Sequence, residues 1–169
     1  YASEAGVSKE LAELNTAWQP VLTNATKILN GKSQVLDTAT TANDFTSKMP
    51  VLNSRMNEGV NILTERNGSA GQVYIATRQM LLADRMIRRV QEIVQGGENA
   101  QSAADGFSRD AALYQAVLNG LIEGAPSMNI KSIDQASARD ILADVSEQWT
   151  GLGETVQKII GASSSLREI

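Results

Sequence analysis

The 169-residue chain contains no cysteine and no histidine. Their absence removes thiol chemistry, imidazole acid–base catalysis and ordinary zinc sites, so we expect neither an enzyme nor a bound cofactor or metal. No run approaches the roughly 20 consecutive apolar residues of a membrane span, and the N-terminus has no signal-peptide pattern. We therefore expect any membrane anchor or export signal to lie outside these residues.

Positive charge is also scarce. The chain has 15 Lys and Arg against 19 Asp and Glu, which gives a formal net charge of −4. Nucleic-acid binding needs a broad basic surface, so we expect no nucleic-acid partner. With 42% hydrophobic residues, the chain can bury one or two modest cores.

Apolar residues recur at alternating steps of three and four, which predicts an all-α fold with coiled-coil-like packing. No segment of comparable length alternates with period two. The pattern predicts that more than two-thirds of the chain is helical, with helices near 8–30, 35–66, 72–95, 100–123 and 133–161. Turns or helix ends are expected at Asn30-Gly31, Asn67-Gly68, Gly96-Gly97 and Gly124-Ala125. Pro20 and Pro50 should each kink a helix or mark its end.

Two tryptophan-containing segments align without gaps. Residues 11–28 and 142–159 share five identities at an offset of 131, including Trp18 with Trp149. This internal repeat predicts tandem modules, with residues 1–67 closing a first module and residues 71–169 opening a second. Both tryptophans lie on apolar stripes and are expected in bundle cores, the alternative being that one of them lines a ligand cavity.

Four arginines lie within twelve residues, at the sequence ATRQMLLADRM (76–86) and the IRR that follows it. If Val73, Met80, Ile87 and Val94 form the packed seam of this helix, Arg78 and Arg85 share the opposite face. They are flanked there by a second apolar strip, at Ile75, Leu82, Met86 and Ile93. A helix that is apolar on two faces packs against its own bundle and against something else, for which a second copy of the chain is the simplest candidate. The arginines could bind an anion between subunits, pair with acids of a partner, or lie solvated beside local acids such as Asp84 or Glu92.

The segment 76–86 resembles the P-box of PilJ/NarX-type sensor domains, whose pattern is close to A-G-R-Q-R-M-L-S-Q-R-M. Six positions match: Ala76, Arg78, Gln79, Leu82, Arg85 and Met86. The segment 11–21 resembles the late helix of the same domain. The resemblance implies an elongated, antiparallel four-helix sensor module in the periplasm, lying between the transmembrane helices of an inner-membrane protein.

The resemblance also implies a function. Tandem modules of this kind are typical of methyl-accepting transducers of type IV pilus systems, which implies a sensory domain controlling twitching motility and surface sensing. Implied partners are a second copy in a homodimer, pilin as a protein stimulus, and a cytoplasmic histidine kinase and adaptor. Two alternatives remain: a nitrate or nitrite sensor domain, and a structural helical rod without a ligand.

One P-box position departs from the anion-sensing pattern. The nitrate and nitrite sensors of this group bind the anion through the central P-box arginine, and Met80 stands at that position here. Methionine has no charge and no strong donor, so we interpret Met80 as core packing and do not expect nitrate sensing by that mechanism. The remaining candidates for an interface or a ligand site are Arg78, Gln79, Arg85, Arg88 and Arg89. Arg78 and Arg85 are predicted to serve an interface rather than catalysis.

Overall fold

The computed structural model describes the backbone of residues 4–166, and the side chains of residue 4 and residues 6–162. Helices occupy more than two-thirds of the chain, which confirms the all-α prediction. In chain order they are α1 (Glu4–Glu65), α2 (Ala70–Gln95), α3 (Ala100–Glu123), the short 3₁₀ helix η1 (Pro126–Met128), α4 (Ala136–Gly151) and α5 (Gly153–Leu166). In the described part of the chain, β pairing is limited to one isolated bridge between Ala125 and Ile130.

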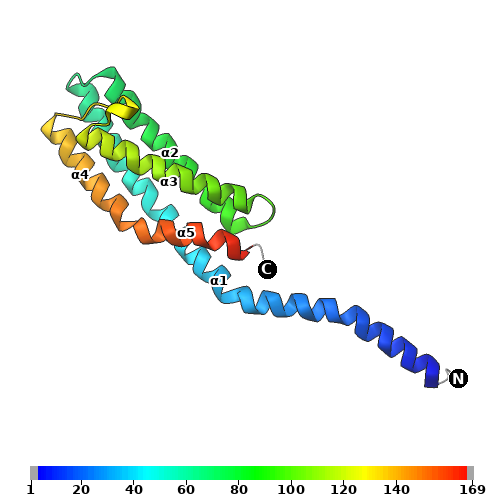
Figure 1. The fold of residues 1–169 in the computed structure, drawn as a ribbon. Coiled ribbons are helices and arrows are strands. Elements are labelled where there is room, and N and C mark those ends of the chain that lie inside the picture. Colours follow the sequence, from blue (N-terminus) through cyan, green and yellow to red (C-terminus); the bar gives the residue numbers. More distant parts are fainter. Residues whose placement is uncertain (1–3, 167–169) are drawn as a thin grey trace.

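The helices form one antiparallel four-membered bundle with a long extension (Figure 1). The second half of α1, α2 and α3 are three members, and α4 followed by α5 makes the fourth. Both α1 and α3 contact α4 and α5, and α2 contacts α1 and α3. The first half of α1 projects away from the bundle as a single helix (Figure 1). No helix in the described residues is long and apolar enough to cross a membrane.

The bundle core is built on steps of three and four along each helix. From α1 it receives Ala42, Phe45, Met49, Leu52, Met56 and Leu63, all buried. Phe45 meets Phe107 of α3 edge to face, with ring centroids 5.2 Å apart. Tyr114 of α3 lies 4.5 Å from Trp149 of α4, also measured between ring centroids. The aromatic pairs thus join α1 to α3 and α3 to α4 across the core.

Local signals explain where α2 begins and where α2 and α3 end. Ser69 caps α2 by accepting a hydrogen bond from the Gln72 backbone N–H, in a capping box. Gly68 is required just before it, because a Cβ there would lie 2.8 Å from the Leu63 carbonyl oxygen. Gly96 and Gly124 follow α2 and α3 with φ of 71° and 91°, which favour glycine. These ends agree closely with the predicted helices 72–95 and 100–123.

Two predicted helix boundaries are wrong. Helices 8–30 and 35–66 are one continuous helix, so Asn30-Gly31 is not a turn, and both Pro20 and Pro50 lie inside α1. A glycine costs a helix only about 1 kcal/mol relative to alanine, and Pro50 stands between the buried Met49 and Leu52, whose packing holds the helix together. Conversely, the single helix predicted at 133–161 is two helices, α4 and α5, which are divided at Leu152.

The two aligned tryptophans have opposite environments. Trp149 is 5% exposed, as predicted, whereas Trp18 is 56% exposed, so its predicted core position is not found within this chain. The reason is that the described residues place no covering layer over residues 7–30 of α1, all of which are exposed, although the apolar stripe is present there. Packing of α1 against α2, α4 and α5 also crosses the predicted module boundary at residues 67–71. The assignment of residues 1–67 and 71–169 to two modules stays a prediction, and residues 1–3 and 167–169 lie outside the described residues.

We expect Trp149→Ala to lower the free energy of unfolding of this chain by about 3–5 kcal/mol, because it leaves a cavity beside Tyr114. Trp18→Ala should change it by less than about 0.5 kcal/mol, because an exposed side chain has little packing to lose. Urea unfolding followed by circular dichroism measures both. Equal losses in the two variants would contradict the exposed position of Trp18.

Candidate functional site

Helix α2 carries the P-box residues, and its core face is rotated from the predicted seam. Of that seam, Val73, Met80 and Ile87 are only half-buried and Val94 is exposed, so the predicted seam is wrong. Leu82, Met86 and Ile93, expected on an outward-facing strip, are buried in the core of this chain. That expectation is wrong because α2 lies between α1 and α3, so its apolar face spans both contacts. Met80 is half-buried and packs against the core.

Two of the predicted arginines converge on one acid of α3. Arg85 donates from Nε to Asp110 Oδ2 at 2.7 Å and from Nη2 to Oδ1 at 2.6 Å. Arg89, one turn further along α2, donates from Nε to Asp110 Oδ2 at 2.8 Å. We call Arg85, Arg89 and Asp110 the arginine clasp. A forked, charge-assisted contact of this kind fixes the register of α2 against α3.

The electrostatics of the clasp centre on Asp110, whose side chain is only 7% exposed. Burial alone raises the pKa of this carboxyl group, but the hydrogen bonds from Arg85 and Arg89 outweigh burial and leave the pKa below its ordinary value. The pKa of Arg85 is raised, chiefly by its hydrogen bond to Asp110. One carboxylate faces two guanidinium groups, so the clasp has a net positive charge.

Gly106 gives Arg89 the room to reach Asp110. It lies one helical turn before Asp110 on α3, and a Cβ built there would fall 2.0 Å from Arg89 Nη1 and 2.3 Å from Cζ. The guanidinium group therefore occupies the space that any larger residue at position 106 would need.

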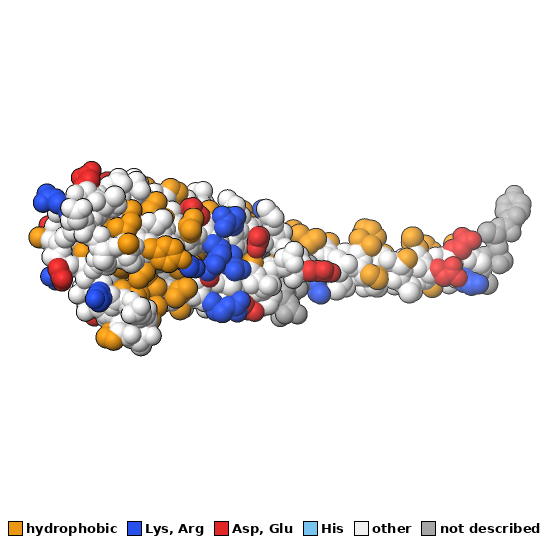
Figure 2. All heavy atoms as spheres, turned by 90° about the horizontal axis from the view of Figure 1, so that it is seen from above, with side chains coloured by type: hydrophobic (Ala, Val, Ile, Leu, Met, Phe, Trp, Pro, Cys, Tyr) orange, Lys and Arg blue, Asp and Glu red, His pale blue; other side chains and the backbone are white. Residues whose placement is uncertain are grey.

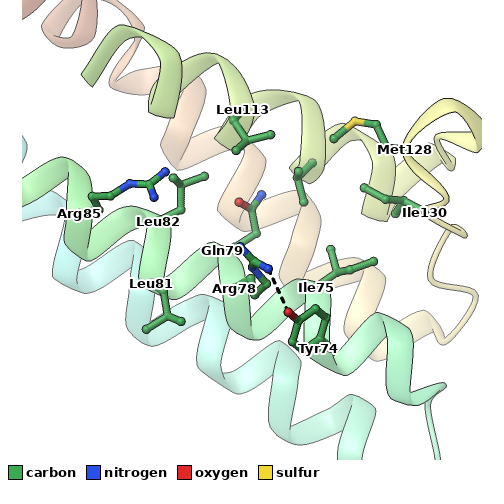
Figure 3. A pocket seen from close by; sticks show the side chains of 11 residues that line it. Tyr74, Ile75, Arg78, Gln79, Leu81, Leu82, Arg85, Leu113, Met128 and Ile130 are labelled. Atoms are coloured by element: carbon green, nitrogen blue, oxygen red, sulfur yellow. Dashed lines mark hydrogen bonds between the residues drawn. The ribbon is translucent and has the colours of Figure 1, made fainter. Parts of the chain in front are cut away.

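A groove lies between α2 and α3, beside the clasp, and reaches the η1 segment (Figure 3). Its volume is about 630 Å³. We call it the α2–α3 groove; it is lined by Tyr74, Ile75, Arg78, Gln79, Leu81, Leu82, Arg85, Leu113, Val117, Met128 and Ile130. In Figure 3, Arg85 lies at one end, and Met128 and Ile130 lie at the other.

Arg78 and Gln79 lie next to each other in the groove but have different surroundings. Arg78 is exposed, donates from Nη1 to the Tyr74 hydroxyl at 2.9 Å, and lies 5.6 Å from the centroid of the Tyr74 ring. Among the described side chains, no carboxylate pairs with Arg78. Gln79 is buried, and its Nε2 donates to the Tyr114 carbonyl oxygen at 2.9 Å, which ties α2 to α3.

The structure brings together four of the five candidate residues. Arg78, Gln79 and Arg85 line the groove, Arg85 and Arg89 form the clasp, and Arg88 is exposed outside both. Whether they serve an interface or a ligand stays a prediction. The sequence analysis did not identify Asp110 and Gly106 as the residues that Arg85 and Arg89 contact. The sequence signal that could have identified Asp110 is its place as an acid on the apolar face of α3, between Phe107 and Tyr114.

We expect Asp110→Asn to lower the free energy of unfolding at pH 7 by about 1–3 kcal/mol, because it weakens hydrogen bonds from two charged groups. In the folded state the pKa of Asp110 lies below its ordinary value of 3.8. The carboxylate therefore contributes fully to the free energy of unfolding above pH 3.8, and this contribution is lost as the pH falls through the folded-state pKa. The stability difference from the parent should therefore shrink below about pH 4. Asp105→Asn, an exposed acid of the same helix, is the control. Urea unfolding from pH 7 to 3 measures both, and equal losses would contradict the clasp.

A second variant tests the same clasp without changing any charge. Gly106→Ala should displace the Arg89 guanidinium group and raise the pKa of Asp110 toward its ordinary value, because one donor is lost. Gly151→Ala is the matched control, since nothing lies within 4 Å of a Cβ at that position. A carboxyl carbon titration by NMR measures the pKa of Asp110. An unchanged value would show that Arg89 does not act on Asp110.

No family profile matches this chain. It is 33% identical over 167 residues to Protein PilJ of Pseudomonas aeruginosa, an alignment that covers 99% of this chain. It is 32% identical over 160 residues, 94% of this chain, to the putative methyl-accepting chemotaxis protein AlkN of Alcanivorax borkumensis. The chain spans about a quarter of the length of either relative, 24% in both cases. Because the similarity extends over nearly the whole chain, this protein is homologous to the chemoreceptors PilJ and AlkN.

Proposed function

We propose that the chain is a periplasmic sensory domain of a chemoreceptor-like transducer that controls type IV pilus function, twitching motility and surface sensing. The observation that carries the proposal is the homology to PilJ along 99% of the chain. The P-box resemblance at 76–86 supports it, because five residues of that segment line a groove on the bundle surface. In this role the domain binds or contacts a stimulus and passes a displacement to other parts of the receptor.

The proposal includes the partners of the whole receptor. These are a second copy in a homodimer, transmembrane helices on either side of this domain, and a histidine kinase and adaptor reached through a cytoplasmic signalling domain. Pilin is the proposed protein stimulus. The half-buried position of Met80 argues against the nitrate or nitrite alternative, because a thioether packed on the core offers no anion a charge.

Helix α1 is the element suited to carry a displacement. One row of apolar residues continues along it at seven-residue intervals: Leu14, Val21, Ile28, Val35, Ala42, Met49, Met56 and Leu63. The last four are buried in the bundle, whereas the first four are exposed. Because α1 is one uninterrupted helix from Glu4 to Glu65, we expect a movement of the bundle to reach the projecting half through its backbone.

We also propose that the projecting half of α1 closes a preceding module of the same kind. Its apolar stripe aligns, residue by residue, with buried positions in α4, in α5 and at Leu152 between them. The pairs are Leu11 with Leu142, Leu14 with Val145, Trp18 with Trp149, Val21 with Leu152, Ala25 with Val156 and Ile28 with Ile159. The correspondence of all six positions supports a fourth-helix role for residues 11–28. In this arrangement the first module ends within α1 rather than at residue 67, and the second half of α1 opens the next module.

We expect the projecting half of α1 to be protected from hydrogen exchange only in the longer parent protein. In the 169-residue chain, amides of residues 4–37 should exchange quickly, because the side chains of residues 7–30 are all exposed. Mass spectrometry of peptides from residues 4–37 measures the difference, and peptides from α3 are the control, since their protection should be equal in both proteins. Fast exchange of residues 4–37 in the parent protein would contradict a preceding bundle.

We expect this chain to restore pilus-dependent surface motility when it replaces the matching quarter of PilJ in P. aeruginosa. An unrelated helical bundle of equal length should not restore it. Equal restoration by that bundle, with equal amounts of receptor in the membrane, would favour the structural rod instead.

A matched pair of insertions in α1 tests how the output depends on this helix. Duplicating residues 31–37 adds seven residues and preserves the apolar row, whereas duplicating residues 31–34 rotates the two halves by about 40°. We expect the hybrid with seven added residues to retain motility and the hybrid with four to lose it. Equal motility in both would show that α1 is only a spacer.

A further inference from the structure

The α2–α3 groove combines an apolar surface with positive charge that is not neutralised. Leu81, Leu113 and Met128 stand at its edge with 63%, 43% and 38% of their surface exposed. Figure 2 shows a face of the bundle on which hydrophobic side chains border a group of Lys and Arg side chains. Exposed apolar area beside charge on an otherwise polar surface is characteristic of binding sites.

We propose that this groove binds a small amphiphile with a carboxylate head group and an aliphatic chain. Its volume of about 630 Å³ lies within the range of small-molecule sites, roughly 300–1,000 Å³. Such sites are mostly apolar and contain a few polar groups that orient the ligand. The inference deepens the proposed sensory function, on which its biological meaning rests.

The head group is placed by Arg78 and Tyr74. Arg78 uses one N–H to donate to the Tyr74 oxygen, which leaves its other N–H groups free. Because the Tyr74 oxygen accepts that bond, its own O–H is free to donate. The two side chains therefore present several donors, one of them charged, and no described carboxylate satisfies them. A carboxylate is the complementary group, and a neutral head would leave the charge of Arg78 unpaired.

The aliphatic chain is placed by the walls of the groove. Leu82 and Ile130 are buried, and Ile75 and Val117 are half-buried, so an apolar chain would cover surface that is already partly enclosed. Leu113 and Met128 would lose exposed area to it. Arg85 at one end adds attraction for the anion at longer range, since the clasp has a net positive charge.

A second copy of the chain fits the groove less well. A two-fold contact through this face, with the bundles side by side and parallel, would bring Arg78 of one copy close to Arg78 of the other. Like charges that meet without a counter-ion oppose association. A small anion has no such penalty.

Binding can be tested on the 169-residue chain with octanoate, octanol and nitrate, by isothermal titration and by NMR shifts of backbone amides and side-chain methyls. We expect saturable octanoate binding that shifts Ile75, Leu82 and Leu113. Octanol, which has the chain without the charge, should bind at least tenfold more weakly. Nitrate, which has the charge without the chain, should not shift these residues.

Variants assign the binding to the groove. Arg78→Gln should weaken octanoate binding about tenfold, which corresponds to about 1.4 kcal/mol. Tyr74→Phe should weaken it several-fold. Arg109→Gln, an exposed arginine of α3 outside the groove, should leave it unchanged. Circular dichroism checks that all three variants keep the parental helix content.

Several results would overturn the proposal. Equal affinity for octanol and octanoate would remove the head-group site, and equal affinity for nitrate would make this a simple anion site. Absence of shifts in the groove, or self-association that shifts the same residues without octanoate, would exclude an amphiphile site. If the hybrid receptor binds octanoate but fails to signal, only the proposed sensory function is refuted. If the hybrid receptor restores motility but the chain does not bind octanoate, only the proposed amphiphile site is refuted.

Discussion

The structure depends on one continuous row of apolar residues along α1. From Leu14 to Leu63 the row keeps a seven-residue interval, and its second half is buried against α2, α4 and α5. Because the helix is not interrupted, the same 62 residues both build the bundle and project from it (Figure 1). Helices α2, α4 and α5 pack directly on α1, and α3 packs on those three helices. A continuous helix of this kind suits a receptor in which a small movement of one bundle has to reach other parts of the molecule.

The polar contacts of the bundle fix the register of its helices in addition to contributing to stability. The clasp of Arg85 and Arg89 on Asp110, together with the hydrogen bond from Gln79 to the Tyr114 carbonyl, sets α2 against α3 at defined heights. Apolar packing alone tolerates sliding by a turn, whereas a buried carboxylate that loses its partners is costly. The P-box resemblance therefore includes residues that hold the groove in shape, in addition to Arg78, which faces solvent.

Different parts of the fold were predictable to different degrees, for physical reasons. The predicted bounds of α2 and α3 lie close to the observed ones, because a capping serine and glycines with positive φ are local signals for helix ends. The continuity of α1 was missed because Asn30-Gly31 and Pro50 are local signals for an end, and packing on either side of Pro50 outweighs its local cost. The division between α4 and α5 was missed because Leu152 is apolar and keeps the stripe in phase. Asp110 was missed as a site residue because its partners lie 25 and 21 residues away on another helix.

The sequence by itself determined the helical class, the missing catalytic chemistry of histidine and cysteine, and the apolar stripes, because these depend on composition and on spacing within one helix. Only the tertiary structure decided which stripes are covered. Trp18 and Trp149 stand in aligned sequences, yet one is exposed and the other is buried against Tyr114. The tertiary structure also decided that Arg85 and Arg89 share Asp110 while Arg78 stays without a carboxylate partner among the described side chains. The physical reason is that burial and ion pairing are properties of two surfaces in contact, and a single helix specifies only one of them.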